Sequence, residues 1–282
     1  MKKIIRKITK NLLSEEILFK FSNGKSDDNF FVKILPRHFQ YNSEDIRFVK
    51  RNDINYKLSL DNYNDFILFY GINNQNKDIM YSLIKDGDVV LDVGTNIGEV
   101  ILNIAKKNIK GKIYGFEPVD YNYEKLLTNI SLNNFSNIIV NKLALSDKKE
   151  TLFYQEKKGH SGGISMNKEV RNGNNYKAIE SLTLDQFVKE KRLEKIDFIK
   201  VDIEGFEMNF LQGAKETIKK FKPRLFFEID EKKLIQQRTS PEKLMEEIRF
   251  LGYKIIDVES KIEIMPNERA KVHSDIYCLP IE

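Results

Sequence analysis

The sequence has no tryptophan, only one cysteine and only three histidines in its 282 residues. The single cysteine, Cys278, excludes an internal disulfide and a metal site built from several cysteines. It lies in the apolar run IYCLPI, where a buried, inert thiol is expected.

Long apolar runs are also absent. The longest, near FILFYGI, is far shorter than the ~18 residues of a membrane-spanning helix. The basic start, MKKIIRKITKNLL, has isoleucines at helical spacing but neither the apolar core nor the cleavage site of a secretion signal. We expect a solvated amphipathic helix there, with weak contact to an anionic membrane surface as the alternative, in a cytoplasmic enzyme.

The composition is that of a globular protein. Hydrophobic residues make up 41% of the chain and aromatic residues 11%, which supports a packed core. The net charge of +5 is a mild surplus and does not indicate a nucleic-acid partner. We expect an N-terminal α+β extension over 1–72 and a larger domain over 73–282.

Apolar runs and helical stretches alternate in the larger domain. This alternation predicts an α/β fold with a mainly parallel sheet that helices cover on both sides. Two final strands without a helix between them, at 253–258 and 275–281, predict an antiparallel pair at one edge. The other expected strands cover 88–93, 112–117, 137–143, 197–202 and 224–229.

The remaining segments are assigned more coarsely. In the extension, a helix and short strands such as FFVKIL and YKLSL are expected. An insertion over about 150–180, with GHSGGISM in it, predicts a hairpin or lid. Ser240 as N-cap, Pro241 in the first turn and Gly252 past the end bound a helix near the C-terminus.

The stretch VVLDVGTNIGEV, residues 89–100, predicts a buried strand, a tight glycine loop and the start of a helix. Gly94 and Gly98 permit close approach of the backbone to a ligand at the point where parallel sheets bind nucleotides. A purely structural turn is the alternative. The pattern departs from the G-x-G-x-x-G of nicotinamide cofactors, with an acid, Asp92, two residues before the first glycine.

Two later motifs place acids at strand ends. In YGFEP, Glu117 lies 117 − 98 = 19 residues after Gly98, a spacing that favours binding of a ribose over a merely solvated side chain. In IDFIKVDIEGFE, Asp202 ends a strand expected beside the first one, so its carboxylate should face Gly94. Glu204 and Glu207 follow closely, and such acids repel unless a cation or donor lies among them. We assign Glu207 to a helix start and Asp202 to function.

Together VVLDVGTNIGE, YGFEP, NKLALSD and IKVDIEGFE resemble the FkbM family of S-adenosylmethionine-dependent methyltransferases over about residues 75–230. The resemblance implies a Rossmann-like class I methyltransferase fold with a mainly parallel seven-stranded sheet and an antiparallel edge strand. One departure is Thr95, where the family commonly has alanine.

The resemblance also implies roles for particular residues. Asp92 would orient the ammonium side of S-adenosyl-L-methionine, Glu117 would hold the ribose, and Phe116 or Pro118 would pack near the adenine. Asp202 would lie near the methyl donor. The expected cofactor-binding residues are Asp92, Gly94, Thr95, Asn96, Gly98, Glu117, Pro118, Ala144, Leu145, Ser146 and Asp202.

Family members often methylate hydroxyls of sugars or related natural products, so an O-methyltransferase acting on a carbohydrate or glycoconjugate is the expectation. An alcohol acceptor needs a base; the candidates are Asp202, Glu204, Glu228 and His160. The alternatives are a methyltransferase for nucleic-acid bases, a metal-assisted enzyme with Mg²⁺ on acids of this group, and a non-enzymatic binding module. Enzymes that act on exocyclic amines of bases usually have an Asn/Asp-Pro-Pro-aromatic run where this chain has DIEG.

Overall fold

The computed structural model of the 282-residue chain describes residues 12–72, 75–155, 166–167, 176–266, 268 and 273–281. His160 and the first eleven residues, which include most of the expected basic helix, lie outside the described residues. The predictions made for them therefore stay predictions.

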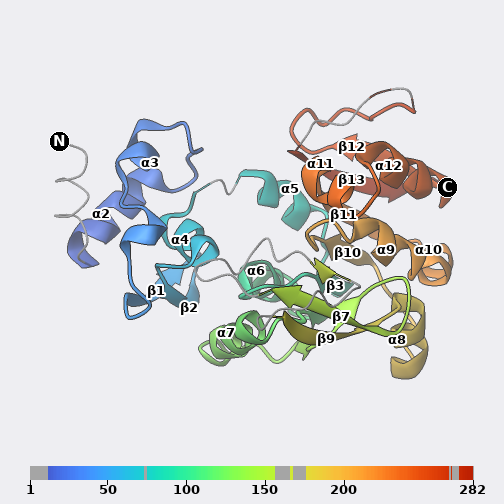
Figure 1. Ribbon diagram of the computed structural model, residues 1–282, viewed down its shortest axis with the longest axis horizontal. Helices are drawn as coiled ribbons and strands as arrows, with labels where there is room; N and C mark the ends of the chain where they lie inside the picture. Colours follow the sequence, from blue (N-terminus) through green and yellow to red (C-terminus); the bar gives the residue numbers. More distant parts are fainter. Residues whose placement is uncertain are drawn as a thin grey trace.

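A seven-stranded sheet forms the core of the larger domain, which lies to the right of the N-terminal elements in Figure 1. Its order is β12-β13-β11-β10-β3-β4-β5, with parallel pairing from β11 to β5. β13 runs antiparallel to both of its neighbours and lies one strand in from the edge. The expected fold is confirmed. The strands are β3 (Val89–Val93), β4 (Lys112–Phe116), β5 (Ile138–Asn141), β10 (Phe198–Val201), β11 (Arg224–Asp230), β12 (Tyr253–Asp257) and β13 (His273–Pro280).

Both faces of this sheet are buried. Leu91 and Val93 belong to one hydrophobic core and Val90 to another on the opposite face, because successive side chains of a strand alternate. This explains why the strand runs are continuously apolar. The helices of this domain are α5 (Gln75–Ser82), α6 (Glu99–Lys107), α7 (Asp120–Ser131), α8 (Leu184–Lys191), α9 (Glu207–Gln212), α10 (Lys215–Phe221), α11 (Glu231–Gln236) and α12 (Pro241–Phe250).

The helix signals at α12 are confirmed. The Ser240 hydroxyl caps the helix by accepting from the Lys243 backbone N–H at 3.4 Å, and Gly252 ends it with φ of +88°. Cys278 is fully buried in β13, as expected. No helix in the described part of the chain is long and apolar enough to cross a lipid bilayer.

The N-terminal extension is more helical than its sequence predicts. The segment FFVKIL is not a strand: Asn29 caps a helix there by accepting from the Phe31 N–H at 2.9 Å, and the segment buries Val32 and Leu35. YKLSL does lie largely in a strand, β2. The elements are α2 (Leu12–Ser22), α3 (Phe30–Ile34), the 3-10 helix η1 (His38–Gln40), β1 (Ile46–Arg51), β2 (Ile54–Ser59) and α4 (Tyr63–Tyr70).

The insertion forms a second, four-stranded sheet of order β6-β9-β7-β8. β7 and β9 pair antiparallel, which confirms the hairpin-like character of the segment. Its function as a lid stays a prediction. The strands are β6 (Ala144–Leu145), β7 (Glu150–Gln155), β8 (Met166–Asn167) and β9 (Tyr176–Leu182).

The extension packs against α6 and α7 and shares a hydrophobic core with them. Buried Asn129 on α7 is central to this contact. Its side-chain oxygen accepts from the Lys57 N–H of β2 at 2.8 Å, and its amide donates to the Ile97 carbonyl of the glycine loop at 2.9 Å. Asn133 makes similar but exposed bonds to Asn55.

Replacing Asn129 with alanine leaves two backbone groups without their partner. We expect Asn129→Ala to lower the free energy of unfolding by about 2–4 kcal/mol, since each unpaired buried group costs ~1–3 kcal/mol. Asn133→Ala, whose partners water can reach, should cost less than ~1 kcal/mol. Urea denaturation of both variants measures the difference, and equal losses would contradict this role of Asn129.

Candidate active site

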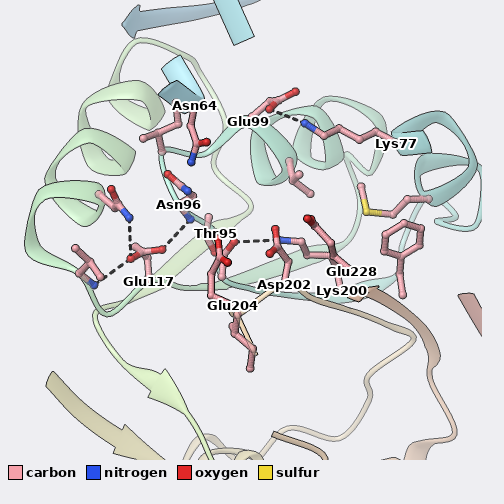
Figure 2. Close-up of a pocket in the computed structure, with 18 of the residues that line it drawn as sticks. Asn64, Lys77, Thr95, Asn96, Glu99, Glu117, Lys200, Asp202, Glu204 and Glu228 are labelled. Atoms are coloured by element: carbon pink, nitrogen blue, oxygen red, sulfur yellow. Dashed lines mark hydrogen bonds and ion pairs between the residues drawn. The ribbon is translucent and has the colours of Figure 1, made fainter. Parts of the chain in front are cut away.

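A pocket of about 290 Å³ opens at the carboxyl ends of the central strands, near the lower end of the ~300–1,000 Å³ typical of ligand sites (Figure 2). α4 and α5 contribute to its wall as well as the sheet and its loops. The lining residues are Asn64, Ile67, Lys77, Met80, Gly94, Thr95, Asn96, Ile97, Glu99, Val100, Glu117, Pro118, Val119, Asn122, Lys200, Asp202, Ile203, Glu204, Phe226, Glu228 and Asp275.

The glycine loop after β3 forms the floor of the pocket. Gly94 has φ of +83°, and a Cβ there would lie 1.8 Å from the Asp202 backbone oxygen, so no side chain fits. The Thr95 hydroxyl donates to the Asp92 carbonyl at 2.8 Å and accepts from the Phe116 N–H at 3.0 Å. Thr95 therefore joins the ends of β3 and β4 at the position where the family commonly has alanine.

Glu117 lies at one end of the pocket, where its carboxylate holds the loops around it. One oxygen accepts from the Asn96 N–H at 2.9 Å, and the other accepts from the Val119 N–H at 3.0 Å and from the Asn122 amide at 3.3 Å. Burial raises the pKa of Glu117 to about 7, against the lowering effect of these three donors. A carboxylate oxygen has further lone pairs for ligand donors.

A buried lysine that sequence analysis missed, Lys200 on β10, lies beneath the other end. Its Nζ donates to the Gly94 carbonyl at 2.9 Å and forms ion pairs at 3.3 Å with Asp92 and with Asp202. Burial opposes its charge, but the surrounding carboxylates outweigh this and raise the pKa of Lys200. The available signal was a lysine inside DFIKVD, a strand expected to be buried on both faces.

The strand register explains how these groups meet. Lys200 lies beside Asp92 of β3 and Phe226 of β11, and a residue two positions later on each strand points to the same face. That next row consists of Gly94, Asp202, Glu228 and Asp275, the last two being directly paired between β11 and β13. Three carboxylates therefore line one wall, next to a position that has no side chain.

The acids of this row have different proton affinities. Burial alone would raise the pKa of Asp202, but the Lys200 ammonium and a hydrogen bond with Glu228 hold it below its usual value. The charge of Asp202 is the largest cause that raises the pKa of Glu228 well above its usual value, and the charge of Asp275 adds to it. Of these two acids, Glu228 therefore binds a proton more readily than Asp202 does.

The acids that follow Asp202 are paired. Glu204 lines the pocket and forms an ion pair with Lys233 of α11. Glu207 is buried, and one of its oxygens accepts from the Ile203 and Gly205 N–H groups at 3.2 and 3.1 Å. The structural role assigned to Glu207 is confirmed, and the cations expected among the acids are Lys200 and Lys233.

The remaining predicted residues lie away from the pocket. Asp92 is fully buried under the loop against Lys200, and burial raises its pKa despite that partner. Gly98 caps α6, where a Cβ would lie 2.8 Å from Leu126. Phe116 packs against Phe187 at a centroid distance of 4.8 Å. The buried residues Ala144, Leu145 and Ser146 lie at β6 and do not line the pocket. Their contact with a cofactor stays a prediction.

The pocket thus collects Gly94, Thr95, Asn96, Glu117 and Pro118 at one end and the base candidates Asp202, Glu204 and Glu228 at the other. His160 lies outside the described residues, so the structure does not test it. Over the described ranges, no group of three or more His, Cys, Asp or Glu side chains is arranged to hold a metal ion.

The strand order and the position of the pocket define a Rossmann-like class I methyltransferase fold. The family model of the methyltransferase FkbM domain matches residues 92–255, which is 255 − 92 + 1 = 164 of the 282 residues. The chain belongs to the FkbM methyltransferase family.

Individual relatives are distant. The chain is 26% identical over 146 residues to Methyltransferase 1 of Beauveria bassiana. This match covers 45% of this chain and 59% of that protein. It is 23% identical over 158 residues to the 2-O-methyltransferase NoeI of Sinorhizobium fredii, covering 51% of this chain and 64% of that protein. The matches thus span less than two thirds of these relatives' length.

A crystal structure of an FkbM methyltransferase from Methylobacillus flagellatus is also similar. It shares 19% identity with a TM-score of 0.45, and the match covers 69% of this chain and 44% of that one. A putative methyltransferase from Streptococcus mutans, solved in complex with SAH, shares 9% identity with a TM-score of 0.45 over 74% of this chain and 97% of that one.

The network at Lys200 predicts a large effect on stability. Lys200→Met leaves the fully buried Asp92 without its cationic partner, so we expect the free energy of unfolding to fall by about 3–5 kcal/mol. The double variant Lys200→Met/Asp92→Asn removes the stranded charge as well and should recover a large part of the loss. Thermal and urea denaturation measure both; a loss below ~0.5 kcal/mol for Lys200→Met would contradict the assignment.

Proposed function

We propose that this protein is an S-adenosylmethionine-dependent O-methyltransferase that acts on a hydroxyl of a carbohydrate, glycoconjugate or related natural product. The observation that carries the proposal is a pocket in which a glycine loop and the carboxylate of Glu117 lie at one end and a row of acids lies at the other. The first end suits a nucleoside, and the second suits a cationic centre and an acceptor that must lose a proton.

The residues present fit the cofactor. Gly94 has no Cβ, so the bare backbone of the loop lines the pocket, and the buried side-chain oxygen of Asn96 has no hydrogen-bond partner among the described residues. Glu117 would accept from the ribose hydroxyls, and Pro118 would pack near the adenine. When bound, S-adenosylmethionine supplies a methyl group on a positively charged sulfur.

The chain's own contribution to catalysis is alignment and proton removal. In a one-step displacement, holding the acceptor oxygen in line with the methyl group supplies much of the rate enhancement. Asn64 and Ile67 of α4 form part of the pocket wall, so the extension would help to position what binds there. This supports a role of residues 1–72 in ligand binding.

The choice of a hydroxyl acceptor rests on the acidic row and on the relative NoeI, whose name describes 2-O-methyl transfer. The row disfavours anionic acceptors. DIEG in place of the run typical of amine-directed enzymes disfavours nucleic-acid bases. Metal assistance has less support, because Lys200 and Lys233 already pair with Asp202 and Glu204.

Ligand titration tests the proposal. In calorimetry, the purified chain should bind S-adenosylmethionine and its demethylated product but not NAD. A glycan pool incubated with protein and cofactor should then gain the mass of one methylene group, as mass spectrometry would detect. Tight binding of NAD without any response to the methyl donor would refute the proposal.

Glu117 should govern cofactor affinity. Glu117→Ala removes the acceptor of two ribose hydroxyls and should weaken binding by about 2–4 kcal/mol. In the unmodified protein, affinity should rise with pH through about 7, because protonation of the Glu117 carboxyl removes acceptor capacity. Glu124→Ala, at an exposed glutamate of α7, is the matched control.

Calorimetry at several pH values gives both quantities. The pH dependence that S-adenosylmethionine and its demethylated product have in common should disappear in Glu117→Ala. It should remain in Glu124→Ala. A loss of affinity below ~0.5 kcal/mol in a folded Glu117→Ala variant would mean that the ribose binds elsewhere.

A further inference from the structure

The acidic row brings carboxyl groups of three neighbouring strands together. Asp202, Glu228 and Asp275 come from neighbouring strands and line the same wall of the pocket. Of the cations near them, Lys200 pairs with Asp202 and also with Asp92 beneath the loop, while Lys233 pairs with Glu204. Glu228 therefore lies beside two acids, Asp202 and Asp275. Lys200 lowers the pKa of Glu228, and Lys233 is not among the groups that shift it.

We propose that Asp202 and Glu228 act as a proton-holding pair that the cofactor's sulfonium discharges, so that the enzyme becomes a competent base only when the methyl donor is bound. The inference rests on the proposed function, because it assumes that S-adenosylmethionine occupies this pocket. It goes further by assigning the base and the condition that activates it.

The position of the pair beside the glycine loop supports this step. Asp202 directly follows β10, and its backbone oxygen lies 1.8 Å from where a Cβ of Gly94 would be, so a ligand seated on the loop would lie next to the pair. The Glu228 side chain is exposed to solvent, whereas that of Asp202 is partly buried and forms an ion pair with Lys200. Glu228 is therefore the member that an acceptor approaches.

The charge of the ligand decides the protonation state of the pair. Without a ligand, repulsion by Asp202 raises the pKa of Glu228, which favours a proton on the pair. A positive charge beside two carboxylates favours their ionised forms, so binding of a sulfonium expels that proton. The demethylated product has a neutral sulfur and lacks this effect.

The chemical step then balances. The acceptor oxygen bonds to the methyl carbon, the carbon–sulfur bond breaks with its electron pair left on sulfur, and the hydroxyl proton passes to Glu228. Because the sulfur has lost its charge, the pair again holds a proton at the end of the turnover. The enzyme is thereby reset for release of the neutral product.

Proton release on binding tests the proposal without knowledge of the acceptor. Isothermal calorimetry in two buffers of different ionisation enthalpy counts the protons released by S-adenosylmethionine and by its demethylated product. In a series of pH values, the methyl donor should release up to one proton more than the product, in a bell-shaped dependence on pH. Proton changes at Glu117 cancel in this difference, because both ligands carry the same ribose.

Variants assign the difference to the pair. Glu228→Gln should abolish the extra proton release. Asp202→Asn should reduce it, because Asp275 is then the remaining acid of the row beside Glu228. Glu216→Gln makes the same change of charge at an exposed position on α10 and should retain the extra release. Circular dichroism confirms that each variant is folded.

Two results would overturn the proposal, and a third would refute the proposed function instead. Equal proton release by the two ligands at every pH would overturn the proposal, as would extra release that persists in both pair variants. Failure of the unmodified protein to bind either ligand would instead refute the proposed function on which this inference rests.

Discussion

The ammonium of Lys200 is the interaction on which the rest of the site depends. It lies in the centre of a parallel sheet, where an unpaired charge is strongly disfavoured, and it is tolerated because carboxylates of β3 and of the β10 end surround it. Its third contact, with the Gly94 carbonyl, fixes the glycine loop against the neighbouring strand. One side chain thus connects the core of the sheet with the floor of the pocket.

The two ends of the pocket use carboxylates in different environments. Glu117 is surrounded by hydrogen-bond donors from two loops, so its position is fixed before any ligand binds. Glu228 is under the influence of the charges of Asp202 and Asp275, which raise its pKa, and of Lys200, which lowers it. Environment, and not residue type, separates a group that holds a ligand from one that exchanges a proton.

The N-terminal extension is joined to this architecture by polar contacts as well as by its core. Asp65 of α4 directly follows Asn64, which lines the pocket wall. The buried side chain of Asp65 forms an ion pair with Lys125 of α7. Asn129 joins the β2 backbone to the glycine loop. Movement of the extension would therefore be felt at the loop, which is consistent with its proposed contribution to ligand binding.

The sequence by itself determined the order of strands and helices in the larger domain, since continuous apolar runs, caps and glycines are local signals. It also placed Gly94, Glu117 and Asp202 at strand ends, where parallel strands bring side chains together. FFVKIL was misassigned because two competing periodicities fit a segment so short, and the Asn29 cap favoured a helix.

Only the tertiary structure decided which acids meet. The pairing of Glu228 with Asp275 and its proximity to Asp202 follow from strand register, which links residues far apart in the chain. The same holds for Lys200, whose burial was predictable but whose partners Asp92 and Gly94 were not. Local patterns set where each strand ends, whereas the charges of a site depend on which ends become neighbours.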